Sequence, residues 1–118
     1  MKRTVCFLLL ITTIVTLSAC VAGGVKGSVV RVSDSGDAEL DIMPQKLLEQ
    51  IDIGSTVIVS IGKFEKEMPF VDEILTEDEK LQLYFDKEDW GLRICIFNNN
   101  FCEKYDIDAG DKVVIGKK

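Results

Sequence analysis

Two segments of the sequence share one pattern: Ile51-Asp52-Ile53-Gly54-Ser55-Thr56-Val57-Ile58-Val59 and Ile107-Asp108-Ala109-Gly110-Asp111-Lys112-Val113-Val114-Ile115. In each, Ile-Asp-x-Gly follows a predicted helix and an apolar strand comes next. Glycine suits such a turn because it adopts positive φ without steric cost. The repeat predicts two similar strand–helix–strand halves in one small barrel, although a glycine before an apolar strand also arises by coincidence.

The remaining sequence between residues 27 and 116 predicts short strands separated by turns, which is typical of a barrel or sandwich. We expect strands at Gly27–Val32, Ala38–Ile42, Ser55–Ile61, Met68–Ile74, Leu81–Phe85, Leu92–Phe97 and Lys112–Ile115. We expect short helices at Gln45–Ile51, opened by Pro44, and at Asn98–Tyr105, where Asn98 or Asn99 can act as the N-cap. The predicted fold is therefore mainly β, a small β-barrel with two short helices, preceded by a signal helix.

The N-terminal segment differs from the barrel sequence. It opens with the basic Met1-Lys2-Arg3, and the run from Val5 to Leu17 is almost wholly apolar. This run is shorter than the about 20 apolar residues that cross a bilayer, but it suits the apolar region of an export signal. An uncleaved anchor would need a longer run than Gly23 and Gly24 allow.

The run ends in Leu17-Ser18-Ala19-Cys20, which resembles the lipobox of bacterial lipoproteins. In that family the cysteine thiol carries a diacylglyceryl group and the peptide is cut just before it. An ordinary secretory signal would not need a cysteine at this point. The resemblance implies a signal peptide at 1–19, a lipidated linker at 20–26 and a barrel domain at 27–116. It also implies export to the bacterial envelope, with attachment to the membrane through lipid on Cys20.

The net charge of the chain limits the classes of partner that it can bind. Without Lys2 and Arg3 the chain keeps 12 basic against 20 acidic side chains, a net charge near −8. Such a surface repels nucleic acid and anionic lipid headgroups, so we expect no nucleic-acid partner and a membrane contact made by the lipid. Another envelope protein or a second copy of the chain remains as a protein partner.

Two cysteines remain beyond the lipidated one. Cys95 and Cys102 would pair if the second helix folded back on its preceding strand, because disulfides are allowed in an exported protein. We favour the alternative, in which they are two small buried side chains.

The residue types exclude several chemistries. The chain has no histidine, so it cannot by itself form a Ser-His-Asp or Cys-His arrangement. Asp34, Asp37 and Asp41 could gather around a cation, but they lack the spacing of an EF-hand, and we expect no metal site. Trp90, the only tryptophan, would stack on a ring-shaped ligand if exposed or plug the barrel end if buried; we favour the second.

The order of these motifs resembles the C-terminal barrel domain of the S-adenosyl-L-methionine (SAM) hydroxide adenosyltransferases, relatives of the SAM-dependent chlorinases and fluorinase. That domain begins with a glycine–valine strand, a turn reading Asp-x-Phe-Gly-Asn, and then Thr-Asn-Ile. The counterparts here are the segment from Gly27 to Asp37 and then Leu40-Asp41-Ile42. The family's end reads Gly-x-Leu-Glu-Ile-Ala, a helix, and Gly-Asp-x-Val-x-Val. Its counterparts are Gly91-Leu92-Arg93-Ile94-Cys95 and Gly110-Asp111-Lys112-Val113-Val114-Ile115.

The departures from the family concentrate at its ligand site. Two asparagines near the family's nucleoside are replaced by Asp37 and Asp41, and ionised aspartate accepts hydrogen bonds without donating them. The family's serine before its last long strand is replaced by Glu88 or Asp89. The family's catalytic N-terminal domain, with its Asp-Arg-His set, has no counterpart in this sequence.

We therefore do not expect the chain to be an enzyme on its own. The prediction is a membrane-anchored lipoprotein carrying a degenerate, non-catalytic barrel that binds a ligand or a protein. Asp37, Asp41, Asp89 and Trp90 are the candidate pocket residues. Adenosine or SAM is the ligand implied by the resemblance, and no other cofactor is expected. One alternative is a half-enzyme that binds adenosine or SAM with a separately encoded catalytic domain; another is a ligand-free structural module.

Overall fold

A computed structural model of the chain describes residues 24–118. The predicted signal peptide at 1–19 and the lipidation residue Cys20 lie outside these residues. The strands are β1 (Val25–Val32), β2 (Ala38–Leu40), β3 (Thr56–Ile61), β4 (Phe64–Val71), β5 (Leu81–Asp86), β6 (Gly91–Ile96) and β7 (Lys112–Lys117). The helices are α3 (Pro44–Leu48) and α4 (Phe101–Tyr105).

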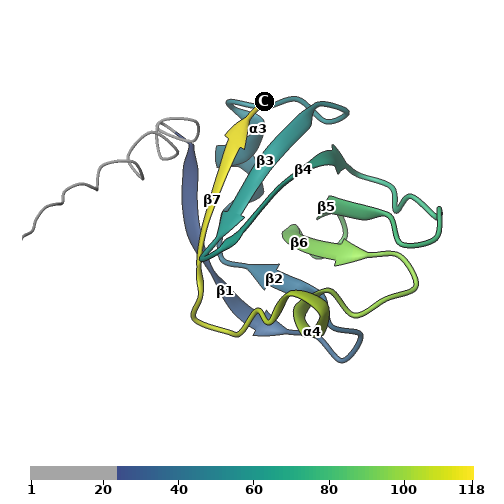
Figure 1. Cartoon of the computed structure of the whole chain (residues 1–118). Coiled ribbons are helices and arrows are strands. Elements are labelled where there is room, and N and C mark those ends of the chain that lie inside the picture. The colour runs from purple at the N-terminus through teal and green to yellow at the C-terminus, as the bar shows by residue number, and fades with distance from the viewer. Residues whose placement is uncertain (1–23) are drawn as a thin grey trace, which may run out of the picture.

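The seven strands form a closed barrel in the order β1-β2-β6-β5-β4-β3-β7, with β7 pairing back onto β1 (Figure 1). This confirms the predicted class, a mainly β barrel with two short helices. All the strand pairs are antiparallel except β4 with β5, which align in parallel over Phe70↔Leu83 and Val71↔Tyr84. Because β2 pairs with β6, the turn between β1 and β2 lies beside a strand that comes about half the chain length later in the sequence.

The repeated Ile-Asp-x-Gly segments form matching turns. Gly54 and Gly110 have φ values of 97° and 98°, which confirms the expected positive φ. The N–H of Gly54 donates to the Phe70 carbonyl and the N–H of Gly110 to the Val29 carbonyl, both at 2.7 Å. Phe70 and Val29 each donate in return to the residue after the glycine, at 2.9 and 2.8 Å. Each turn thus ties the start of one strand, β3 or β7, to a second strand, β4 or β1.

The barrel interior is filled by the alternating residues of its strands. Val57, Val59 and Ile61 of β3 are buried, and β7 places Val113 and Ile115 beside them. Leu47 of α3 and Phe101 of α4 are also fully buried, so both helices extend the same core. Burying a side chain of this size contributes about 1.5–3 kcal/mol, which exceeds what such short helices can gain from their own hydrogen bonds.

Several element bounds differ from the expected ones. β1 begins at Val25, inside the expected linker, because Val25 is buried and pairs with Ile115. β4 runs over Phe64–Val71 instead of Met68–Ile74, since its charged first half completes a hairpin with β3. β2 is shorter than expected, and α3 ends three residues before the predicted Ile51. β7 continues to Lys117, past the predicted Ile115 and the domain end at residue 116.

The second helix is capped by a different asparagine from the two predicted. α4 begins at Phe101, and the side-chain oxygen of Asn100 accepts the Glu103 N–H at 2.8 Å. Asn98 instead adopts a φ of 63° and belongs to the turn after β6. The cap lies one or two residues later than predicted because this turn separates β6 from the helix.

Cys95 and Cys102 are both buried and unpaired, as favoured from the sequence. Burial raises the pKa of the Cys95 thiol to about 12 and that of Cys102 to about 11. Both thiols therefore stay protonated at neutral pH.

No helix within residues 24–118 is long and apolar enough to cross a membrane.

Candidate functional site

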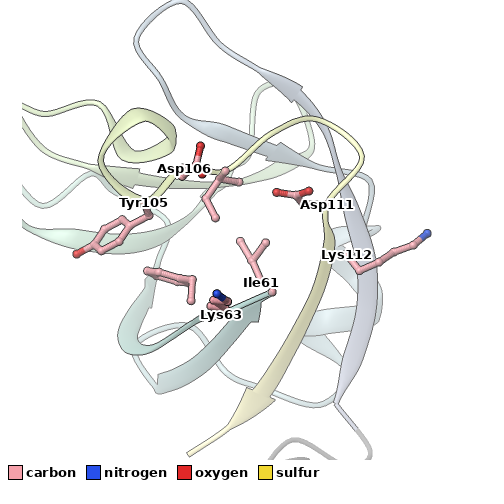
Figure 2. Close-up of a pocket in the computed structure, with 9 residues that line it drawn as sticks. Ile61, Lys63, Tyr105, Asp106, Asp111 and Lys112 are labelled. Carbon is pink, nitrogen blue, oxygen red and sulfur yellow. The ribbon is translucent and has the colours of Figure 1, made fainter.

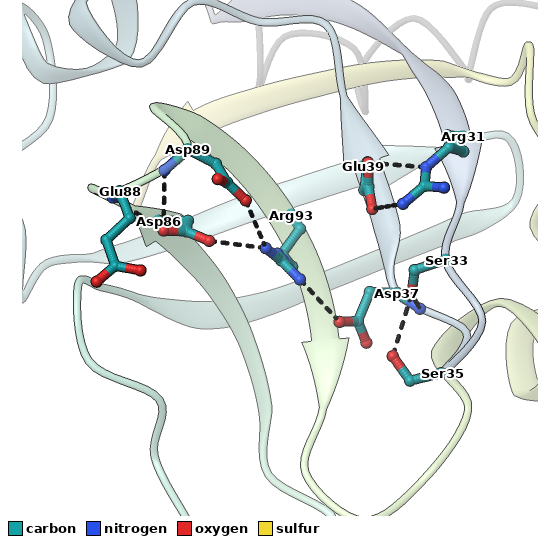
Figure 3. A network of polar contacts seen from close by, with 9 residues as sticks. All are labelled: Arg31, Ser33, Ser35, Asp37, Glu39, Asp86, Glu88, Asp89 and Arg93. Carbon is teal, nitrogen blue, oxygen red and sulfur yellow. Dashed lines mark hydrogen bonds and ion pairs between the residues drawn. The ribbon is translucent and has the colours of Figure 1, made fainter.

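Arg93 is the centre of a polar network on the outer face of the barrel (Figure 3). It lies in β6 between the buried Leu92 and Ile94, so the alternation of the strand directs its side chain outward. Its guanidinium lies 2.8 Å from the Asp86 carboxylate and 3.7 Å from that of Asp37. The guanidinium carbon also lies 5.7 Å from the centre of the Tyr84 ring. The network therefore joins residues from β5, β6 and the turn before β2.

Asp86 organises the hairpin that follows β5. One carboxylate oxygen accepts the backbone N–H groups of Glu88 and Asp89, at 3.0 and 3.2 Å, and the other accepts from Arg93. Burial opposes ionisation of this carboxyl. These backbone donors and the guanidinium prevail and hold the pKa of Asp86 below its usual value. Asp86 is therefore an ionised carboxylate, and both of its oxygens already accept hydrogen bonds within the protein.

The pKa of Asp37 is shifted in the opposite direction from that of Asp86. Burial raises the pKa of Asp37 above its usual value, although the nearby Arg93 guanidinium acts against this shift. Its backbone N–H donates to the Ser33 hydroxyl at 3.0 Å, which fixes it at the end of the turn before β2. Burial and Arg93 therefore act in opposite directions on this carboxyl, and burial is the larger effect.

Next to Arg93 lies a groove of about 380 Å³, which we call the Arg93 groove. Its lining includes Val30, Arg31, Glu39, Asp86, Asp89 and Arg93. Arg31 and Glu39 form a two-bonded ion pair, with distances of 3.1 and 2.9 Å. Each arginine of the groove thus already has a carboxylate partner, and the surplus charge is negative.

Asp37 also lines a second cavity of about 360 Å³, which we call the amide cavity. Its other walls include Cys95, Phe97 and the side chains of Asn98 and Asn99. The Asn99 carboxamide is bound by Glu79 and the Asn100 N–H, and the Asn98 NH2 group donates to Asp78. The Asn98 oxygen has no partner within residues 24–118, and the apolar wall can cover a ring face. Because Asp37 pairs with Arg93 on one side and lines this cavity on the other, it connects the two hollows.

Trp90 matches neither sequence interpretation fully. It is 49% exposed and has a φ of 55°, unusual for a bulky side chain. Its ring meets Phe85 edge to face at 5.1 Å, and its indole N–H donates to the Gln45 side chain at 3.3 Å. One edge of the ring is therefore fixed by the barrel and the rest faces solvent.

The four predicted pocket residues separate into two groups. Asp37 and Asp89 both approach Arg93, Asp89 at 3.9 Å with a side chain that is 79% exposed, and Trp90 follows Asp89 in the same turn. Asp41 does not approach Arg93. Its carboxylate accepts the Ser28 N–H at 2.7 Å and fastens the end of β2 to β1.

Sequence reasoning missed the arginine at the centre. Arg93 is the only charged residue between Leu92 and Phe97, and a lone charge in an apolar strand is a signal that could have identified it. Asp86 ends an apolar strand and carries no such signal. Within residues 24–118, no three cysteine, aspartate or glutamate side chains are grouped in a way that could hold a metal ion.

No protein-family model matches the sequence, and no curated protein matches it either. Solved structures do share its fold. An uncharacterized conserved protein from Thermotoga maritima is similar with a TM-score of 0.71 and 20% identity, over 79% of this chain and 36% of that one. A conserved hypothetical protein from Thermus thermophilus is similar with a TM-score of 0.57 and 14% identity, over 81% of this chain and 37% of that one. The chain thus spans about a third of the length of these two proteins.

Proposed function

We propose that the chain is a lipoprotein of the bacterial envelope whose barrel is a non-catalytic binding domain. Membrane attachment rests on the sequence Leu17-Ser18-Ala19-Cys20 after an apolar run, with lipid on Cys20. Stable anchoring takes two acyl chains, and a diacylglyceryl cysteine supplies them. The barrel would then act at the membrane surface, related by descent to the C-terminal domain of the SAM hydroxide adenosyltransferases.

The observation that carries the binding role is the position of Asp37 between the Arg93 groove and the amide cavity. A nucleobase needs donors and acceptors along one edge and apolar cover on its face. In the amide cavity Phe97 can cover a ring face, and the amide oxygen of Asn98, whose NH2 group donates to Asp78, can accept from the exocyclic amino group of adenine. Adenosine is therefore the first ligand to test, followed by SAM.

The same network disfavours catalysis. Asp86 is held ionised by three donors, and Glu39 is bound by both ends of the Arg31 fork. A general acid or base needs a pKa near the working pH and a free proton path. With these carboxylates already paired and no histidine in the sequence, the groove offers no candidate general acid or base.

The test is heat unfolding of the full lipoprotein in detergent, with and without adenosine or SAM. A ligand at 100 times its dissociation constant adds roughly 2.7 kcal/mol, which is on the order of ten degrees for a domain of this size. We expect adenosine to raise Tm in the wild type and not in Asn98→Gly, which keeps the positive φ but removes the amide, with Asp52→Asn as a control remote from the cavity. Equal shifts in all three proteins would contradict binding at the amide cavity. The absence of any shift would contradict a nucleoside ligand and leave protein binding or a structural role.

A half-enzyme is the second candidate, because the similarity covers only 36% of the Thermotoga maritima protein. A separately encoded partner would then supply the catalytic residues, and SAM would bind at the joint surface. In this case SAM would raise Tm only in the presence of that partner. SAM binding by the isolated lipoprotein would contradict this alternative.

A further inference from the structure

A third hollow lies apart from the Arg93 groove and the amide cavity. This pocket, of about 560 Å³, lies between the β3–β4 turn and the chain that joins α4 to β7 (Figure 2). It shares no lining residue with the other two hollows. Its volume falls in the range of about 300–1,000 Å³ typical of small-molecule sites. We call it the end pocket.

The floor of the end pocket is apolar. Ile61, Phe64 and Ile107 line it, and each is buried in the barrel core. The Tyr105 ring forms a wall and is held in place by Phe64, whose ring centre is 4.8 Å away. The core therefore fixes the shape of this pocket.

Charged groups of opposite sign line its two sides. Lys63 stands on the two-residue β3–β4 turn, whereas Asp106 and Asp111 stand on the connection between α4 and β7. Figure 2 shows Lys63 and the two aspartates on different sides of Ile61, while Lys112 extends away from the pocket. The charges thus lie across the apolar floor from one another.

These charges have no ion-pair partner of their own. None of the ion pairs within residues 24–118 includes Lys63, Asp106 or Asp111. Asp111 is nevertheless held in place. One carboxylate oxygen accepts the Asp108 N–H at 2.9 Å, and the backbone carbonyl accepts the Val29 N–H at 2.8 Å. The other carboxylate oxygen has no hydrogen-bond partner among the described residues and is free for a ligand.

We propose that the end pocket binds a small zwitterion with an apolar body, an amino acid or short peptide with free termini. The ammonium group pairs with Asp111 and Asp106. The carboxylate pairs with Lys63, and the apolar side chain covers Ile61 and Ile107. The dipeptide Leu-Leu carries all three features.

The experiment is calorimetric titration of the full lipoprotein in detergent with Leu-Leu, with leucine and with a Leu-Leu peptide blocked at both termini. Protein-free micelles provide the blank. We expect Leu-Leu or leucine to bind, and the blocked peptide to bind at least tenfold more weakly. Which of the two binds better distinguishes a peptide from a free amino acid.

Substitutions then locate the site. We expect Lys63→Gln and Asp111→Asn each to weaken binding at least tenfold. The amide oxygen of asparagine still accepts the Asp108 N–H, so the turn is preserved. Lys117→Gln and Asp52→Asn, at the other ends of β7 and β3, are matched controls that should bind within twofold of wild type. Unchanged Tm values would show that all four variants fold.

Three results would overturn the proposal: no binding of leucine or Leu-Leu at millimolar concentration, equal binding of the blocked peptide, or equal binding by Lys63→Gln, Asp111→Asn and the controls. None of them bears on adenosine binding, because the two sites share no residue.

Discussion

At the residue scale, Asp37 and Asp86 contact the same arginine but have opposite pKa shifts. Asp37 is dominated by burial, which raises its pKa, whereas hydrogen bonds from two backbone N–H groups and Arg93 lower the pKa of Asp86. A carboxyl whose folded pKa is raised makes folding less favourable once it ionises. One whose folded pKa is lowered contributes stability above its unfolded pKa, and this is lost as pH falls. The two residues should therefore respond oppositely to neutral substitution.

We expect Asp37→Asn to raise Tm at pH 7 and Asp86→Asn to lower it. The loss in Asp86→Asn should be about 1–2 kcal/mol, since the amide oxygen still accepts the backbone donors but the NH2 group cannot accept from Arg93, so that charged hydrogen bond is lost. The Asp37 difference should shrink as pH falls towards about 4, because its folded pKa lies above the unfolded one, whereas the Asp86 difference should shrink only as pH falls below about 4. Asp89→Asn is the control and should shift stability by less than about 0.5 kcal/mol, because its exposed side chain lies 3.9 Å from Arg93. Heat unfolding from pH 3 to 7 measures all three variants, and equal signs for Asp37→Asn and Asp86→Asn would contradict this assignment.

At the element scale, the turn before β2 holds α4 in place. The Gly36 carbonyl accepts the Cys102 N–H at 2.9 Å, and a Cβ at Gly36 would collide with the carboxamide of Asn100, the cap of α4. Gly36 also has a φ of 89°. This glycine is thus required both for its backbone conformation and for the space it leaves.

Gly36→Ala should therefore cost more than Gly54→Ala. Gly54 has a similar φ but open space around it, so its substitution should cost about 1–2 kcal/mol from conformation alone. Gly36→Ala should add the loss of the Asn100 cap, typically about 1 kcal/mol. In an Asn100→Ala background the two glycine substitutions should become nearly equal. Denaturant unfolding of the single and double variants measures this, and equal costs in the wild-type background would show that Asn100 moves aside freely.

The element scale also shows what the sequence can and cannot predict. Strong apolar runs such as Thr56–Ile61 and the glycine of each Ile-Asp-x-Gly turn were identified because the signals are local. The first half of β4 was missed, since Glu65, Lys66 and Glu67 are exposed and the half-strand lacks an apolar pattern. Tertiary pairing with β3 decides its conformation, which a local pattern does not report.

The candidate site was predicted only in part for the same reason. Asp37 and Asp89 were chosen by resemblance, and both approach Arg93. Arg93 itself is brought to Asp37 by the pairing of β2 with β6, in which Ala38 lies opposite Ile94. Asp41 was chosen on the same grounds but caps the Ser28 N–H, because β2 ends one residue before it. The order of the strands depends on contacts between distant parts of the chain, which no local sequence pattern reports.

At the scale of the whole molecule, one barrel presents the Arg93 groove, the amide cavity and the end pocket, and the proposed lipid would hold all of them near a membrane. β1 begins at Val25, so only four residues, 21–24, separate Cys20 from the first strand. Fully extended, they span at most about 14 Å. Removal of residues 1–19, as proposed, would leave a net charge near −8 that repels anionic headgroups, so the proposed attachment would depend on the acyl chains rather than on the barrel surface.

The most direct test of the central claim, a binding barrel held at a membrane by acylated Cys20, is intact-mass measurement of the protein from cells expressing the whole chain. The account predicts a species that begins at Cys20 and carries acyl chains. It also predicts that Cys20→Ser abolishes this species and its recovery in the membrane fraction, whereas Cys95→Ser leaves both unchanged. A wild-type chain that keeps residues 1–19, or a chain without acyl mass that begins elsewhere, would contradict it.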